Sequence, residues 1–325
     1  MAMENFRFAL NSTMPVFLVI LLGWFLQKTG LLNDGFNKPA NQYVFQCALP
    51  VSLFQSIAEM DLYSDFNPRF CLFCFAVTTV MFMGVWGAAW LLMKDRRMVG
   101  AFAQAAARSS AAILGVAFAV NIYGDVGMVP MMIVAAVPFF NIYAVLILSF
   151  SPQTDEAGRL IPPPPNGMEQ VKRACLNVLK NPIIIGILAG IPFALLRIRL
   201  PVMLNSAIKM VGGTATPVAL LVVGASFSGG EALEKWKPAA AATFTKLFLL
   251  PALFLPAAAW MGFRGSEMVA ILIMVGSPTT VSCYVMAKNM HNDGVLTANV
   301  VLLATLFSSV SITLWLFVLR TFALI

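Results

Sequence analysis

The sequence carries very little charge for its length. Asp, Glu, Lys and Arg make up only 11% of the 325 residues, whereas hydrophobic residues make up 60%. A soluble globular domain carries about 25% charged residues, so the composition excludes an ordinary soluble domain. Nearly every long segment is apolar over about 20 residues, the length that crosses a hydrocarbon core as a helix. The composition therefore predicts an all-α, polytopic protein whose surroundings are the lipid bilayer.

Groups that perform catalysis are also scarce. The single histidine, His291, cannot assemble a His-based metal site or a catalytic triad. No glycine-rich phosphate loop is present, so hydrolysis of ATP by this chain is not expected. We therefore expect neither an enzyme nor a cofactor. The excess of basic residues reflects membrane orientation, and no nucleic-acid partner is expected.

Carboxylates are missing from the centres of the apolar segments. All fourteen acidic residues fall in loops or near the ends of predicted spans. Carriers of cations often place a carboxylate at membrane depth as an ion ligand or proton relay. Its absence argues against a cationic substrate and against simple carboxylate-mediated proton coupling. The coupling ion, sodium or proton, is left open.

Hydropathy and the positions of polar residues predict ten spans. They cover residues 8–26, 38–58, 69–93, 99–122, 127–150, 174–196, 201–228, 238–261, 266–288 and 294–320. Residues 151–173 form the longest polar stretch and contain four consecutive prolines, which indicates an extended cytoplasmic linker. The linker separates a first half, residues 1–150, from a second half, residues 174–325, with five spans each.

The two halves share a pattern of residues. Pro15 and Gly23 are followed by Pro182 and Gly190, each 167 positions later, and the segment around Pro50 is matched by the segment around Pro217 at the same distance. Halves with an odd number of spans lie upside down relative to each other, as in many secondary transporters. The pattern predicts a five-plus-five inverted repeat. Most Lys and Arg residues lie in the odd-numbered connections, which places those connections in the cytoplasm and both termini outside it.

The fourth and ninth spans are the least apolar and hold the main candidate site. Arg108 lies deep in the fourth span, where a guanidinium is costly unless it faces a cavity or a partner. Pro278 removes an amide from the ninth span, and the resulting half-helix N-terminus suits a carboxylate. Hydroxyl groups beside both positions can donate hydrogen bonds, although small polar residues also serve close helix packing. The candidate substrate-binding residues here are Arg108, Ser109, Ser110, Ala111, Ser277, Pro278, Thr279, Thr280 and Ser282.

Further candidates lie in neighbouring spans. Pro50 and Pro217 are expected to break the second and seventh spans at matched positions. Polar residues near these breaks either supply ligands or satisfy the released carbonyl groups. The candidate lining residues are Asn41, Gln46, Ser52, Asn141 and Thr216. Lys209 and Lys246 also enter spans, and we expect them to contribute less than Arg108.

Together these motifs resemble those of the auxin efflux carrier family, in its bacterial branch of malonate-transporter-like permeases. The resemblance spans nearly all ten segments. The matching motifs are Asn41-x-x-Val44-Phe45-x-x-Ala48-Leu49-Pro50, Phe102-Ala103-Gln104 through Arg108-Ser109-Ser110 with Gly115 and Tyr123-Gly124, Asn181-Pro182, Pro217-Val218-Ala219-Leu220 with Gly224, and Ser277-Pro278 with Ala287 and Asp293.

The resemblance implies a fold similar to that of bile-acid sodium symporters, in which the broken fourth and ninth helices cross at the substrate site. It also implies organic anions as substrates. Two positions depart from the family pattern, because Ser110 often has Asn as its counterpart and Ala117 often has Pro. Both departures affect the details of substrate contact.

The sequence thus predicts a secondary carrier of a small organic anion, such as malonate or another carboxylate, in a bacterial inner membrane. Transport would proceed by alternating access. A ligand-binding membrane sensor or receptor and an anion channel are the alternatives. The substrate, the direction of transport and the oligomeric state, including a homodimer, are left open.

Overall fold

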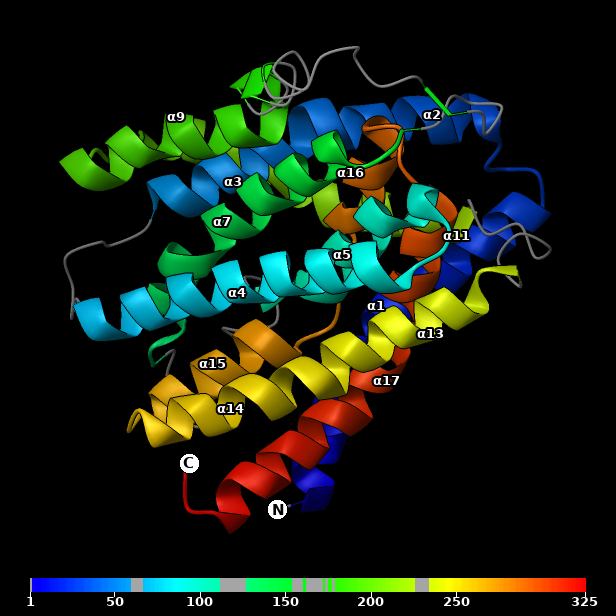
Figure 1. The fold of residues 1–325 in the computed structure, drawn as a ribbon. Helices are drawn as coiled ribbons and strands as arrows, with labels where there is room; N and C mark the ends of the chain where they lie inside the picture. Colours follow the sequence, from blue (N-terminus) through cyan, green and yellow to red (C-terminus); the bar gives the residue numbers. More distant parts are fainter. Residues whose placement is uncertain are drawn as a thin grey trace.

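Helices make up almost all of the part of the chain that the structure describes (Figure 1). The computed structural model describes residues 2–59, 67–111, 127–153, 160–161, 172, 175–176, 179–225 and 234–325. The first part of the chain contains α1 (Ala2–Lys28), α2 (Asp34–Tyr43), η1 (Val44–Ala48), α3 (Leu49–Ala58), α4 (Pro68–Leu92), η2 (Arg96–Met98), α5 (Val99–Ala107) and α7 (Val129–Phe150). The second part contains α9 (Pro182–Leu196), α10 (Val202–Gly213), α11 (Ala215–Ala225), α13 (Trp236–Phe244), η3 (Thr245–Leu249), α14 (Leu250–Trp260), α15 (Ser266–Gly276), α16 (Ser282–Asn289) and α17 (Gly294–Thr321).

Five segments within the described residues are long and apolar enough to cross a membrane. They are Pro68–Leu92, Val129–Phe150, Val202–Ala225, Trp236–Trp260 and Gly294–Thr321. Shorter apolar helices cover Met14–Lys28, Pro182–Leu196 and Ser266–Gly276. The described part of the chain is therefore all-helical, with several segments able to cross a membrane, as in a multi-pass membrane protein. The ten-span count stays a prediction, because residues 112–122 of the fourth span and most of the linker lie outside the described residues.

Two pairs of helices, α1 with α11 and α9 with α3, approach each other closely at a glycine. A Cβ atom on Gly23 of α1 would lie 2.3 Å from the carbonyl oxygen of Leu221 in α11, and one on Gly190 of α9 would lie 2.8 Å from that of Phe54 in α3. Glycine is required at both positions because the backbones approach too closely for a side chain. The 167-residue offset between Gly23 and Gly190 also separates Phe54 from Leu221. This agreement is what two related halves would produce, although the inverted repeat itself stays a prediction.

Two prolines shape their helices without breaking them. Pro50 and Pro251 each follow a π-helical turn, in which Leu49 donates its amide to Val44 and Leu250 donates its amide to Thr245. A proline lacks an amide and its ring clashes with the carbonyl four residues earlier, so the wider turn relieves the clash. The expected break of the second span at Pro50 is therefore a π turn within a continuous helix. In the seventh span the helix is interrupted at Thr214, three residues before Pro217.

Two helices lie in the interior and end there. Nearly all residues of α5 and α15 are buried, and α5 is composed mainly of alanine and glycine, which allow neighbouring helices to approach closely. Both helices are short, and the chain leaves helical geometry at the end of each. Both termini of the chain lie at the same end of the molecule (Figure 1), whereas their side of the membrane stays a prediction.

Candidate functional site

The chain unwinds at two places that meet in the interior, here called the crossing (Arg108–Ser110 and Ser277–Val281). Arg108 follows α5 with φ −78° and ψ 141°, and Ser277 follows α15 with φ −70° and ψ 155°. The amide of Ser110 donates a hydrogen bond of 2.8 Å to the carbonyl oxygen of Pro278. This hydrogen bond joins the backbones of the two extended segments, at positions where the sequence places hydroxyl residues and a proline.

Side chains complete the exchange between the two segments. Thr279 Oγ1 donates to the carbonyl of Ala105 at 2.7 Å, and Gln104 Nε2 donates to the carbonyl of Cys283 at 2.9 Å. The Ser109 hydroxyl donates to the carbonyl of Met274. The last carbonyls of a helix lack partners within the helix. At the crossing, the hydroxyl of each segment supplies a partner to the helix that ends in the other.

Lys246 joins the ends of both helices. Its side chain extends from the π turn η3, is completely buried, and lies 2.7 Å from the carbonyl oxygen of Val275 and 3.5 Å from that of Ala107. It also donates to Ser109 Oγ. The carbonyl of Leu247, which Pro251 deprives of a helical partner, accepts a 2.9 Å hydrogen bond from Trp315 Nε1 instead. The turn that presents Lys246 is thus itself fixed.

Arg108 is the second buried cation at the crossing. Its side chain is 4% exposed. One guanidinium nitrogen donates to Asn141 Oδ1 at 2.5 Å, and the other contacts the sulfur of Met286. Asn141 in turn donates to the carbonyl of Val137 at 2.9 Å. Asn141 therefore orients the guanidinium, which has no carboxylate partner among these contacts.

A small hollow of about 40 Å³ borders the crossing. Five of the candidate residues line it together with side chains from α1, α11 and α17; the candidates are Ser110, Thr216, Pro278, Thr279 and Thr280, and the others include Val16, Leu220, Val301 and Thr305. Thr305 was not predicted from the sequence, because it is one of several hydroxyl residues in the apolar α17. One water needs about 10–15 Å³, so the hollow has room for only a few.

The remaining candidates do not line this hollow. Arg108, Ser109, Ala111, Ser277 and Ser282 belong to the two segments or their flanks, and the Ser282 hydroxyl donates to Thr280 Oγ1 at 3.3 Å. Asn41 is buried, Ser52 packs against Gly212, and Gln46 is exposed. Gly115 and Ala117 lie outside the described residues. The structure thus brings Thr216 to the hollow and leaves Gln46 away from it.

A second hollow, of about 450 Å³, lies between α3, α9 and α10. It is lined by Gln55, Glu59, Arg197, Arg199 and Asn205, among others. Glu59 accepts hydrogen bonds from Gln55 at 3.2 Å and from Asn205 at 2.9 Å. None of the predicted substrate-binding residues lines this hollow.

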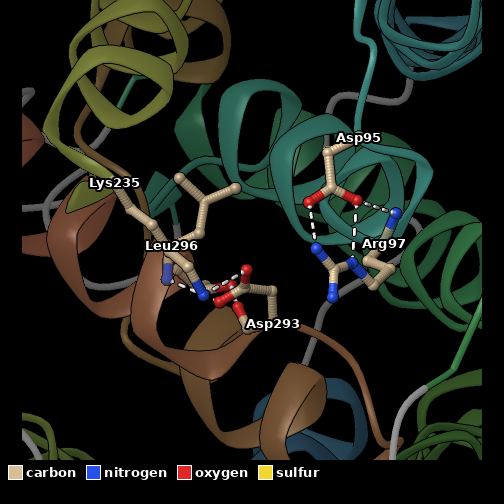
Figure 2. A network of polar contacts seen from close by, with 6 residues as sticks. Asp95, Arg97, Lys235, Asp293 and Leu296 are labelled. Atoms are coloured by element: carbon tan, nitrogen blue, oxygen red, sulfur yellow. Dashed lines mark hydrogen bonds and ion pairs between the residues drawn. The ribbon is translucent and has the colours of Figure 1, made fainter. Parts of the chain in front are cut away.

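Ion pairs between side chains gather at the loops before α5 and α17, in the loop-end cluster of Asp95, Arg97, Lys235 and Asp293 (Figure 2). Arg97 pairs with Asp95 at 2.8 Å and Lys235 pairs with Asp293 at 2.8 Å. The hydrogen bonds from Arg97 hold the pKa of the Asp95 carboxyl below its usual value. Asp293 also caps α17 by accepting the amide of Leu296 at 2.9 Å. The Lys235–Asp293 pair links the starts of α13 and α17, whereas Asp95 and Arg97 pair within the loop before α5.

Comparisons with known proteins relate the chain to membrane transporters. The model of a family described as membrane transport protein matches residues 8–316. The chain is similar to the uncharacterised transporter YfdV of Escherichia coli strain K12, and equally to YfdV of Escherichia coli O157:H7 and of Shigella flexneri. Each comparison gives 23% identity over 292 residues, which cover 87% of this chain and 89% of the relative.

The family match covers nearly the whole sequence, including both interrupted helices, and the relatives are named as transporters, which supports a transport protein rather than an enzyme. The chain belongs to the family of membrane transport proteins that its motifs indicate, the auxin efflux carrier family.

Proposed function

We propose that this protein is a secondary carrier that moves a small organic anion, such as malonate or another carboxylate, across a bacterial inner membrane. The observation that carries the proposal is the charge at the crossing. Arg108 and Lys246 are buried there, and no Asp or Glu is buried among the residues that the structure describes. A buried charge is costly unless a partner compensates it. A substrate anion would compensate the positive charge at the crossing.

The hydroxyl groups at the hollow suit a carboxylate. Thr216 and Thr280 lie on different elements around it, and each hydroxyl can donate one hydrogen bond, whereas Thr305 already donates to the carbonyl of Val301 at 2.7 Å. The amide groups at the start of α16 add the positive end of a helix dipole. In this proposal Arg108 provides positive potential from behind the hollow, and Asn141 holds its guanidinium in place.

The size of the hollow favours alternating access over a permanently open pore. A volume of about 40 Å³ does not hold a dicarboxylate. The substrate can therefore enter only if α1, α11 and α17 separate from the crossing. Carriers of this general type move one bundle of helices against another around a fixed central site. The structure would then correspond to a state in which the site is closed.

Uptake by proteoliposomes tests the proposal. We expect vesicles with purified protein to take up radiolabelled malonate saturably, and vesicles preloaded with unlabelled malonate to accelerate uptake by counterflow. Conductance without saturation would instead indicate a channel. Binding of carboxylates without any uptake would indicate a sensor or receptor. Failure of a panel of mono- and dicarboxylates to bind or to be transported would contradict the proposal.

A further inference from the structure

The surroundings of the Lys246 amine form a closed set of oxygen ligands. An ammonium group has three donors, and three acceptors lie around this one: the carbonyl oxygens of Val275 and Ala107 and the hydroxyl oxygen of Ser109. They come from the unwound segment after α5 and from the ends of α5 and α15. The side chain is completely buried, so water does not compete with these ligands.

The three ligands share one chemical character. Two are carbonyl groups in the last turns of helices, where the helix dipole concentrates partial negative charge. The third is a neutral hydroxyl. Neutral oxygens of this kind bind alkali cations, and in carriers the unwound carbonyls and half-helix C-termini coordinate the coupling sodium ion. A carboxylate, which is the usual partner of a buried lysine, is not among them.

The geometry also shows why a lysine reaches this place. The π turn η3 carries Lys246, and Pro251 after it enforces the wider turn. Trp315 Nε1 holds the carbonyl that the proline leaves without a helical partner. The turn is therefore fixed from both sides and directs the amine between the two helix ends.

We propose that the ammonium group of Lys246 is a tethered cation that occupies the coupling-ion position of this carrier, so that the protein binds and moves its organic anion without sodium. The part of this inference that concerns transport rests on the proposed function. The cation site itself does not depend on which substrate is carried. In this arrangement Lys246 supplies, from within the chain, the positive charge that holds the two helix ends together. It acts through Ser109 and the backbone of the crossing, and is therefore a positioning residue.

Thermal unfolding in different salts tests the cation site without any substrate. The melting temperature of the purified wild-type protein should be the same in sodium chloride and in choline chloride. Lys246→Ala leaves an empty, oxygen-lined position, so its melting temperature should be lowered in choline chloride and raised by roughly 5 °C when sodium or methylammonium is added. Lys246→Met fills the position with an apolar side chain. Its melting temperature should be lowered in choline chloride and should not rise when sodium or methylammonium is added.

Lys209→Ala is the matched control, because Lys209 is an exposed lysine of α10. It should behave as the wild type in every salt. A sodium-dependent rise for the wild type would overturn the proposal, because the cation position would then be free. A folded Lys246→Ala protein that responds to neither cation would overturn it as well.

Malonate uptake by the wild-type protein separates this inference from the proposed function and needs no variant. Equal uptake in sodium and choline media supports both. Uptake that requires sodium contradicts the tethered cation and leaves the carrier intact. A wild type that moves no carboxylate, together with recovery of Lys246→Ala by sodium or methylammonium, contradicts the proposed function and supports the cation site.

Discussion

The crossing, together with the adjoining Lys246, and the loop-end cluster each bring two cations together, but they neutralise them differently. In the loop-end cluster, Arg97 and Lys235 each pair with a carboxylate, and the side chains are 52% and 31% exposed. At the crossing, Arg108 and Lys246 are buried and meet carbonyl groups, a hydroxyl, an amide and a sulfur instead. Bulk water screens the exposed cations of the loop-end cluster, whereas Arg108 and Lys246 are buried away from it.

The difference shows where charge has a functional use in this molecule. Exposed ion pairs contribute about 0–1 kcal/mol each, so the Lys235–Asp293 pair between the starts of α13 and α17 should add little to stability. A buried cation without a carboxylate is expensive, which leaves a place for an anion. Mutations that exchange charge for neutral groups should therefore have much larger effects at the crossing.

Replacement of Lys246 by methionine should have the largest effect on both stability and transport. It removes the donor from the carbonyls of Val275 and Ala107, and each buried polar group without a partner costs about 1–3 kcal/mol. Malonate uptake should fall at least roughly tenfold, the equivalent of about 1.4 kcal/mol. Uptake and thermal unfolding measure the two effects, with Lys209→Met as the control. Malonate uptake at the wild-type rate in this variant would show that the buried charge at the crossing matters no more than the exposed charges of the loop-end cluster.

Arg108→Ala should reduce transport strongly and stability less. The guanidinium has fewer ligands than the Lys246 amine, so we expect anion uptake to fall roughly tenfold while the protein stays folded. Initial rates over a range of malonate concentrations check this result, and a raised KM would indicate loss of anion attraction. Uptake unchanged from the wild type would exclude Arg108 from the mechanism.

Thr279→Val should have an intermediate effect. It removes an uncharged hydrogen bond to Ala105 at nearly constant volume, which costs about 1–3 kcal/mol when the carbonyl is left buried without its partner. Thermal unfolding compares it with Thr313→Val, whose hydroxyl bonds within its own helix. Equal melting temperatures for both variants would show that the exchange between the two segments contributes little.

Lys235→Gln should have a small effect, because it removes only a partly exposed ion pair. We expect the free energy of unfolding to change by about 0–1 kcal/mol. The capping hydrogen bond from Leu296 to Asp293 remains in this variant. Unfolding in low and high salt measures the change, and a loss comparable to that of Lys246→Met would contradict the ranking.

Acid should weaken the loop-end cluster through Asp95. Its pKa is lowered in the folded protein by Arg97, so the stabilisation is fully present above the unfolded value of about 3.9 and is lost as the pH falls from there through the lower pKa of the folded protein. The difference in melting temperature between the wild type and Arg97→Gln should therefore be small at pH 7 and shrink steadily as the pH falls below about 3.9. A difference in melting temperature that grows on acidification would contradict a lowered pKa of Asp95 in the folded protein.

Some parts of this arrangement could be predicted from the sequence because they depend on local chemistry. Proline and hydroxyl residues in apolar segments identify positions where a helix can be interrupted, and the chain leaves helical geometry at Arg108 and Ser277. The apolar runs likewise predict the long helices. Family membership follows from motifs spread over the whole chain.

Other parts depend on side-chain direction, which the sequence does not contain. The sequence places both Lys209 and Lys246 in spans but does not show which of them extends to the membrane surface; Lys209 is exposed, whereas Lys246 is completely buried. Gln46, one turn before Pro50, is exposed rather than lining the hollow. The π turn changes the direction of every residue near Pro50, and no simple periodicity reports it.

The π turn η3 also alters how the outer surface of its segment must be read. A π turn contains one residue more than an α turn, so the stripe of residues that contacts lipid is displaced by about 100° around the axis between α13 and α14. A helical wheel drawn continuously from Trp236 to Trp260 would assign the wrong residues to the bilayer in one of its halves. Spin labels or lipid-accessible cysteines placed along the segment should follow two phases, which change at Thr245–Leu249.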